Sequence, residues 1–235
     1  MDPLTLHTAA RRYLVDRCSE LRGVGARHVV DAMLVEVERL DVDDLPDALP
    51  SVLRALAWAA RTSETDSRGD AAEDAAMRDE RARFARAVVG WTSADEVVVE
   101  PLAYRRTLSA EEGERWRALL LERWGPSVAG WMPLEFDDVV PGVLVVSTQT
   151  AWDDEWVDGL RALLRARGVE RVFELREWGA DREIEVAALV PSYTGAEGMW
   201  TDGGLDWVIY ASHEGTAAYG GWLAEALEPV AGPWR

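Results

Sequence analysis

The chain has 235 residues, of which 48% are apolar, and it carries a formal net charge of −18. This length and composition are typical of one or two globular domains, each large enough for its own hydrophobic core. A negative field of this size repels phosphate backbones and anionic lipid surfaces, so we expect neither a nucleic-acid partner nor a membrane partner. The same field attracts basic proteins, although plain solubility also explains it.

The cysteine content and the N-terminal sequence indicate in which cellular compartment the protein is expected. Cys18 is the only cysteine, so no intrachain disulfide can form. The opening MDPLTLHTAARRYL lacks the basic and apolar regions of a signal peptide. No apolar run approaches the roughly 20 residues that span a bilayer. We therefore expect a cytoplasmic, reduced protein.

Tryptophan content and charge divide the chain into two regions. Eleven of the twelve tryptophans follow residue 90. Residues 1–90 carry 13 arginines and 17 acidic residues, whereas residues 91–235 carry 12 and 26. We therefore expect a helical bundle region over 1–90 and a tryptophan-rich mixed α/β domain over 91–235.

The first region predicts four amphipathic helices. Asp2 and Pro3 form a helix start, with proline at the first helical position, where its missing N–H costs nothing. Apolar residues then recur at helical spacing, and short polar segments interrupt the pattern. The predicted helices span about 3–22, 26–40, 52–60 and 71–89.

The second region alternates strands and helices. Strands are predicted at VVVEPLAY (97–104), at the short apolar run VLVVS (143–147) and at VERVFELREW (169–178). A capping box of Ser109 and Glu112 opens one intervening helix, and Thr150 opens the other. This order predicts βαβ crossovers with parallel pairing and makes VLVVS a buried strand.

Antiparallel hairpins are predicted after these crossovers. RVFELREW and REIEVAAL flank a turn at Gly179, with Phe173 and Leu175 expected on the same face as Ile184. LDWVIYAS and TAAYGGWL flank Gly215, which supplies the positive φ of a tight turn. The segment PSYTGAEGMWTDGG (191–204) between the hairpins is predicted to be a loop. The fold class is therefore α+β, with βαβ crossovers and C-terminal antiparallel hairpins.

The stretch DWVIYASHEGT contains the only histidine of the second region, His213. Neighbouring side chains on a strand point to opposite faces, so His213 is not expected to activate Ser212. No His follows at the spacing of H-E-x-x-H, and no phosphate-binding glycine motif is present, so we expect no metal and no cofactor. A hydrolase-like alternative keeps His213 as general base, with Asp206 or Glu214 orienting it and Tyr210 nearby.

The tryptophans divide between core and surface predictions. Trp116, Trp156 and Trp207 lie on predicted apolar faces and are expected in the core. Others lie near predicted loops, where tryptophan commonly marks recognition surfaces. These are Trp131, Trp178, Trp200 and Trp234.

Three functional hypotheses follow. The first is an acidic protein-binding module, for example an immunity or antitoxin protein that masks the cationic site of a toxic enzyme. The second is a small-molecule enzyme that uses His213, and the sequence favours it less than the binding module. The third is a scaffold that assembles through the helical region. The expected contacts of the first hypothesis are Tyr193, Glu197, Trp200, Asp202, Glu183 and Glu185.

Overall fold

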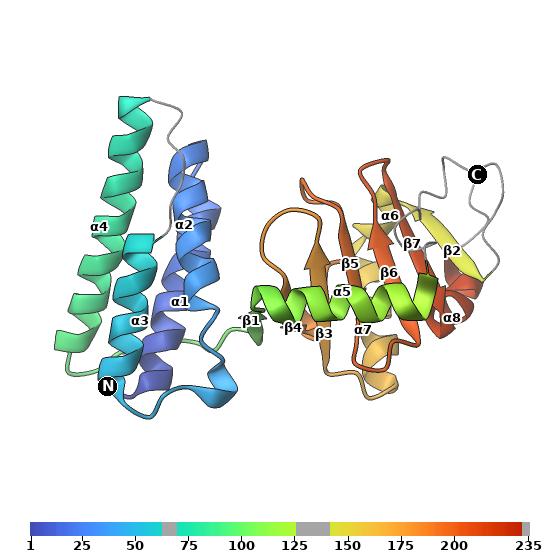
Figure 1. Ribbon diagram of the computed structural model, residues 1–235, viewed down its shortest axis with the longest axis horizontal. Helices are drawn as coiled ribbons and strands as arrows, with labels where there is room; N and C mark the ends of the chain where they lie inside the picture. The colour runs from blue at the N-terminus through green and yellow to red at the C-terminus, as the bar shows by residue number, and fades with distance from the viewer. Residues whose placement is uncertain (63–69, 126–141, 232–235) are drawn as a thin grey trace. The chain divides into compact units, whose positions relative to one another are not determined.

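The computed structural model describes residues 1–62, 70–125 and 142–231. These residues form two compact units, Met1–Leu102 and Ala103–Arg235. The first unit is helical and the second is built on one antiparallel sheet, which confirms the α+β class (Figure 1).

The predicted four helices of the N-terminal unit are present. The first begins as expected, because the carboxylate of Asp2 accepts the backbone N–H of Thr5 at 2.9 Å and Pro3 occupies the first turn. The last helix continues beyond residue 90, so Trp91 packs against the core of this unit. The helices are α1 (Pro3–Glu20), α2 (Val24–Val37), α3 (Leu49–Thr62) and α4 (Ala71–Ser93).

Polar groups inside the bundle are bonded within it. Arg11 donates to the fully buried carboxylate of Glu38 at 2.9 Å, and Arg17 donates to Glu80 at 2.6 Å. His7 is buried with Nε2 at 3.2 Å from the carbonyl oxygen of Val37, and burial lowers the pKa of its imidazole. These side chains are therefore structural parts of the bundle.

The C-terminal unit contains a seven-stranded sheet in the order β1-β4-β3-β5-β6-β7-β2. Every pair of neighbouring strands is antiparallel. The strands are β1 (Arg105–Thr107), β2 (Val143–Ser147), β3 (Arg171–Arg176), β4 (Arg182–Glu185), β5 (Gly198–Thr201), β6 (Trp207–Ala211) and β7 (Thr216–Gly221).

The predicted parallel pairing is therefore wrong for the described strands. Helix α5 (Ala110–Trp124) joins β1 to β2, which lie at opposite edges of the sheet. Helices α6 (Thr148–Ala151) and α7 (Asp154–Ala166) join β2 to β3, which run in the same direction but have β5, β6 and β7 between them. The predicted crossover connections are present, but the strands that each one connects are not neighbours in the sheet. Other strands, including those of the C-terminal hairpin, lie between them. VLVVS is consequently an edge strand.

Helices cover both faces of this sheet. Helix α5 lies across one face (Figure 1), and its Trp116 stacks on Phe173 with ring centroids 3.8 Å apart. Helices α7 and α8 (Trp222–Ala231) pack against the other face, where Trp156 and Trp207 are buried as predicted. Strand β6 contributes to both cores, so its side chains are buried on both sides.

The register of the β3–β4 hairpin differs from the prediction by one residue. Phe173 pairs with Glu183, and Val172 pairs with Ile184. Phe173 therefore faces α5, whereas Ile184 lies in the core on the other face. The turn sets this register, and a shift of one residue moves every side chain to the opposite face.

Two further strand predictions need correction. Residues 97–104 form no strand and β1 begins only at Arg105, although the carbonyl oxygen of Tyr104 accepts the N–H of Glu185 at 2.9 Å. Pro101 has no N–H to donate to a sheet. The predicted loop 191–204 contains the missed strand β5, in which Trp200 is fully buried. The flanking glycines and acids of β5 gave the segment the composition of a loop.

Candidate functional site

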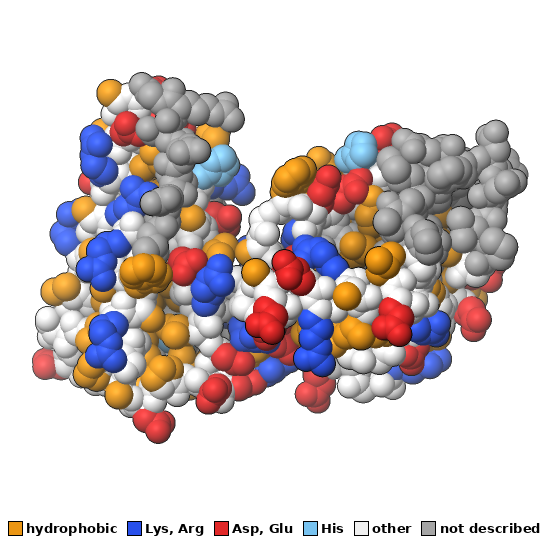
Figure 2. Space-filling view, viewed as in Figure 1, with side chains coloured by type: hydrophobic (Ala, Val, Ile, Leu, Met, Phe, Trp, Pro, Cys, Tyr) orange, Lys and Arg blue, Asp and Glu red, His pale blue; other side chains and the backbone are white. Residues whose placement is uncertain are grey.

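One end of the C-terminal sheet gathers acidic and aromatic side chains. Strand β3 ends before Glu177 and Trp178, β5 begins after Glu197, and β6 ends before His213 and Glu214. These strands are neighbours, and the N–H of Glu177 donates to the carbonyl oxygen of Glu197 at 2.9 Å. We call these five residues the acidic end of the sheet. Figure 2 shows a histidine beside acidic side chains there.

Glu197 connects the residues of the acidic end. Its Oε1 atom lies 2.5 Å from Nδ1 of His213 and 3.4 Å from the backbone nitrogen of the same residue. Its Oε2 atom accepts the hydroxyl of Tyr210, and Ser212 donates to Oε1 at 3.5 Å. A single carboxylate from the loop before β5 therefore holds the end of β6 and the turn that follows.

Both ring nitrogens of His213 lie close to carboxylates: Nδ1 is hydrogen-bonded to Glu197, and Nε2 forms an ion pair with Glu214. Nε2 lies 2.8 Å from Oε1 of Glu214, opposite the bond to Glu197. The hydrogen bond to Glu197 raises the pKa of His213, whose side chain is 51% exposed. The two carboxylates favour the protonated ring, which has no lone pair to accept a proton from a substrate.

The environment fixes the charges around the ring. Burial opposes ionisation of Glu197, but hydrogen bonds from Tyr210 and His213 outweigh it and lower the pKa of the carboxyl. Burial, and then the neighbouring carboxylate, raise the pKa of Tyr210, so its hydroxyl stays neutral. The acidic end therefore contains one half-buried carboxylate, Glu197, and two exposed carboxylates, Glu177 and Glu214.

An exposed aromatic ring and a small pocket adjoin these acids. The side chain of Trp178 is 73% exposed. A pocket of about 160 Å³ is lined by Glu177, Glu197, Tyr210 and two arginines. Both arginines are held by their own chain. Arg117 donates to Asp181 at 2.5 and 2.7 Å, and Arg176 donates to Thr194 at 2.7 Å and to the carbonyl oxygen of Ala196 at 2.9 Å.

The structure brings only some of the predicted site residues together. Glu197 and Glu214 contact His213, Tyr210 bonds to Glu197, and Tyr193 lies half-buried in the loop before β5. Asp206 precedes β6 while His213 follows it, so Asp206 lies at the wrong end of the strand to orient the ring. The prediction that Asp206 orients His213 is therefore wrong, and of the two predicted partners only Glu214 lies beside the ring.

Trp200 and Asp202 also lie away from the acidic end. Trp200 is fully buried in β5, so the prediction that it contributes to an exposed recognition surface is wrong. Asp202 follows β5 and accepts the N–H of Gly204 at 3.0 Å, as a turn residue does.

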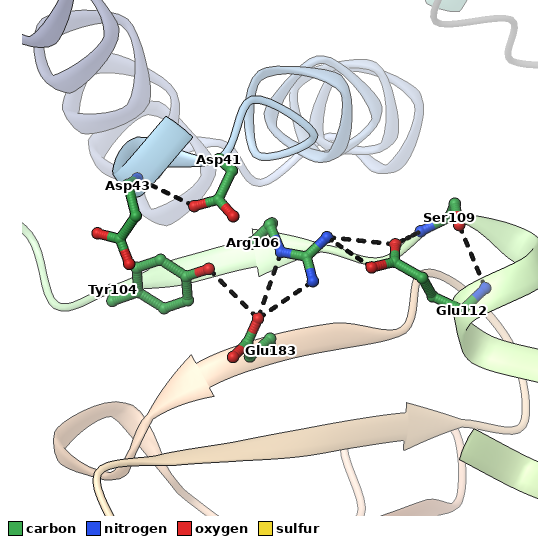
Figure 3. A network of polar contacts seen from close by, with 7 residues as sticks. All are labelled: Asp41, Asp43, Tyr104, Arg106, Ser109, Glu112 and Glu183. Atoms are coloured by element: carbon green, nitrogen blue, oxygen red, sulfur yellow. Dashed lines mark hydrogen bonds and ion pairs between the residues drawn. The ribbon is translucent and has the colours of Figure 1, made fainter. Parts of the chain in front are cut away.

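Glu183 belongs to the polar network of Figure 3, and Glu185 on the same strand bonds to Tyr104, a residue of this network. Glu183 accepts from Arg106 at 3.1 Å and from the hydroxyl of Tyr104 at 3.3 Å. Arg106 in turn donates to Glu112, the residue of the predicted capping box, at 2.9 Å. Glu185 accepts the backbone N–H of Tyr104 at 3.0 Å. These carboxylates join β1, β4 and α5.

Sequence reasoning missed two features of the site. Glu177 is not among the predicted contacts, although it lies near the end of the predicted strand 169–178, two residues before the turn glycine Gly179. The contact between Glu197 and His213 depends on the pairing of β5 with β6, and β5 was read as a loop. Trp131 and Trp234, which were predicted near loops, lie outside the described residues.

Known sites and known proteins offer no assignment. Within residues 1–62, 70–125 and 142–231, no group of three or more His, Cys, Asp or Glu side chains is arranged to hold a metal ion. None of the described helices combines the length and apolar character that crossing a membrane requires. Comparison with protein-family models, with curated proteins and with solved structures found no match to this chain.

Proposed function

We propose that this chain is a protein-binding module that holds a basic protein partner through the acidic end of its sheet. The observation that carries the proposal is the convergence of Glu177, Glu197 and Glu214 at one end of the sheet, together with the exposed Trp178 that follows Glu177 in the chain. An immunity or antitoxin role in the cytoplasm, in which the module masks a cationic active site, is the concrete form of this proposal.

The chemistry of the surface supports a basic partner. Residues 103–235 contain 12 arginines and 23 acidic residues, so this unit has a net charge of −11. Several of these arginines are already committed to ion pairs within the unit, among them Arg106, Arg117 and Arg161. The remaining negative field steers a cationic partner and speeds its association.

Trp178 supplies the apolar part of the proposed contact. Tryptophan buries a large area with few rotamers and is enriched among the residues that dominate binding energy. Its ring also accepts a cation over its face, so an arginine of the partner has both an aromatic surface and nearby carboxylates. Exposed charge alone gives less specificity than this combination.

The alternatives have less support. The hydrolase-like alternative needs an unprotonated nitrogen on His213, and both nitrogens lie within 2.8 Å of carboxylates that favour the protonated ring. The scaffold alternative would use the helical unit, which exposes several apolar residues, among them Val24 at 66%, Val89 at 64% and Trp58 at 57%. Scattered apolar residues are normal on soluble proteins and do not indicate an interface.

A site-specific photocrosslinker tests the proposal in the native cell. Placed at Trp178, it should give one discrete adduct with a protein of basic isoelectric point. Leu121 is the matched control, because it is 52% exposed on α5 of the same unit and outside the acidic end. The same adducts from both positions, or none at position 178, would contradict the proposal.

A further inference from the structure

A second concave site lies on the face of the sheet opposite α5. A pocket of about 800 Å³ opens between α6, α7 and α8. This volume falls within the range of roughly 300–1,000 Å³ that is usual for small-molecule sites. None of its lining residues belongs to the acidic end, so the two sites are independent.

One part of the wall of this pocket is apolar and packed into the core. Trp156, Leu163 and Leu227 line it, and all three also pack in the core on this face. The indole N–H of Trp156 donates to the buried hydroxyl of Tyr219 at 2.9 Å, which holds the ring in position. The pocket is therefore pre-formed, which reduces the cost of ordering on binding.

The charge at the pocket is negative. Among its described lining residues, the charged ones are Asp153 and Glu155, at the start of α7. Asp153 caps the helix, accepting the N–H groups of Glu155 and Trp156 through Oδ1 at 3.0 and 3.1 Å. These carboxylates occupy the helix N-terminus that would otherwise attract an anion.

We propose that this pocket binds an organic cation with an apolar body. The body packs against Trp156, Leu163 and Leu227, and the cationic group lies at the carboxylates of Asp153 and Glu155. Opposite charges attract, so these exposed carboxylates favour a cationic group at the mouth of the pocket and disfavour an anionic one. Cationic, neutral and anionic ligands of equal shape should therefore be bound in that order.

Isothermal titration calorimetry with three probes tests this order. The probes 4-phenylbutylamine, 4-phenylbutanol and 4-phenylbutyrate share one apolar body and differ in charge at pH 7. For ligands of this size we expect the amine to bind with a Kd of about 1 mM or tighter. The alcohol should bind at least fivefold more weakly, and the butyrate should give no measurable heat. Equal binding of all three probes, or no binding of the amine, would overturn the proposal.

Gly159 provides a variant that fills the pocket without disturbing the fold. It lines the pocket from α7, and a Cβ built on it has nothing within 4 Å. Gly159→Leu should abolish amine binding, since it places a side chain in the cavity and favours the helix. Gly90→Leu is the matched control, because Gly90 lies in α4 with equally open space around its Cβ. Amine binding that survives in Gly159→Leu would rule out this pocket.

Glu155→Gln tests the charge separately from the shape. We expect this substitution to weaken the binding of the amine at least threefold and to leave the affinity for the alcohol unchanged. Glu122→Gln removes an exposed carboxylate from α5 and should change neither affinity. An equal loss of amine and alcohol binding in Glu155→Gln would show that the pocket does not select charge, and the proposal would fail.

Discussion

Nδ1 of His213 lies 2.5 Å from Oε1 of Glu197, so the turn after β6 is bonded to the loop before β5. The two residues are 16 positions apart in the chain, and the pairing of β5 with β6 brings them together. The geometry of the acidic end therefore depends on the ionisation of this pair.

The bond between His213 and Glu197 should make stability depend on pH. The pKa of His213 is raised above its ordinary 6.5, so its contribution is complete below pH 6.5 and is lost as pH rises through the folded pKa. The pKa of Glu197 is lowered from 4.5, so its contribution is complete above pH 4.5 and is lost as pH falls through the folded pKa. The pair should stabilise the fold most between these values.

Urea denaturation of wild type and His213→Ala at pH 5.5 and pH 8.5 measures this effect. The difference in the free energy of unfolding should be larger at pH 5.5. His28→Ala, which removes an exposed histidine from the helical unit, is the control variant. A His213→Ala difference that is the same at both pH values would contradict the ion pair.

Trp200 and Trp178 should respond in opposite ways to truncation. Trp200→Ala empties a fully buried site and should cost about 3–5 kcal/mol of unfolding free energy. Trp178→Ala should change stability by less than about 0.5 kcal/mol, since the ring is 73% exposed. Thermal and chemical denaturation compare the two variants. Similar losses from both would mean that Trp178 is part of the core.

Substitutions at Glu183 and Glu177 should differ in their effect on stability, because Glu183 is bonded within the fold and Glu177 is exposed. Glu183→Ala removes the acceptor of Arg106 and Tyr104 and should lower the free energy of unfolding by about 2 kcal/mol. Glu177→Ala should leave stability nearly unchanged and weaken only partner binding. A stable Glu183→Ala variant would show that the network joining β1, β4 and α5 contributes little.

Gly221 should tolerate no side chain. Its φ is +69°, and a Cβ would lie 2.0 Å from the carbonyl oxygen of Asp206. Gly221→Ala should therefore cost about 3 kcal/mol or more, from backbone strain and overlap together. Gly168 has a φ of +78° but open space around its Cβ, so Gly168→Ala should cost only about 1–2 kcal/mol. Equal costs, measured by urea denaturation, would contradict the close approach at Gly221.

Local signals predicted the elements of this chain well. The helix starts at Asp2 and Ser109 and the hairpin turns at Gly179 and Gly215 follow from capping and backbone preferences that a few residues decide. The alternation of Trp207 and Val208 between two cores also follows from the strand period.

Relations between distant segments could not be predicted in the same way. Strand order is a property of the whole sheet, so the strands joined through α6 and α7 were expected to be neighbours and are not. Strand β5 has only four residues and begins at Gly198, so its sequence resembles a loop. With β5 unrecognised, Glu197 and His213 could not be placed together, and Trp200 was assigned to the surface.

The most direct test of the central claim is the affinity for the partner captured at position 178, measured by calorimetry at 50 and 300 mM salt. Wild type should bind at least tenfold more weakly at the higher salt, because screening acts on exposed charges. The double variant Glu177→Gln and Glu214→Gln should bind more weakly at low salt and lose most of this salt dependence, while Glu111→Gln on α5 should behave as wild type. Unchanged affinity and salt dependence in the double variant would contradict the role of the acidic end.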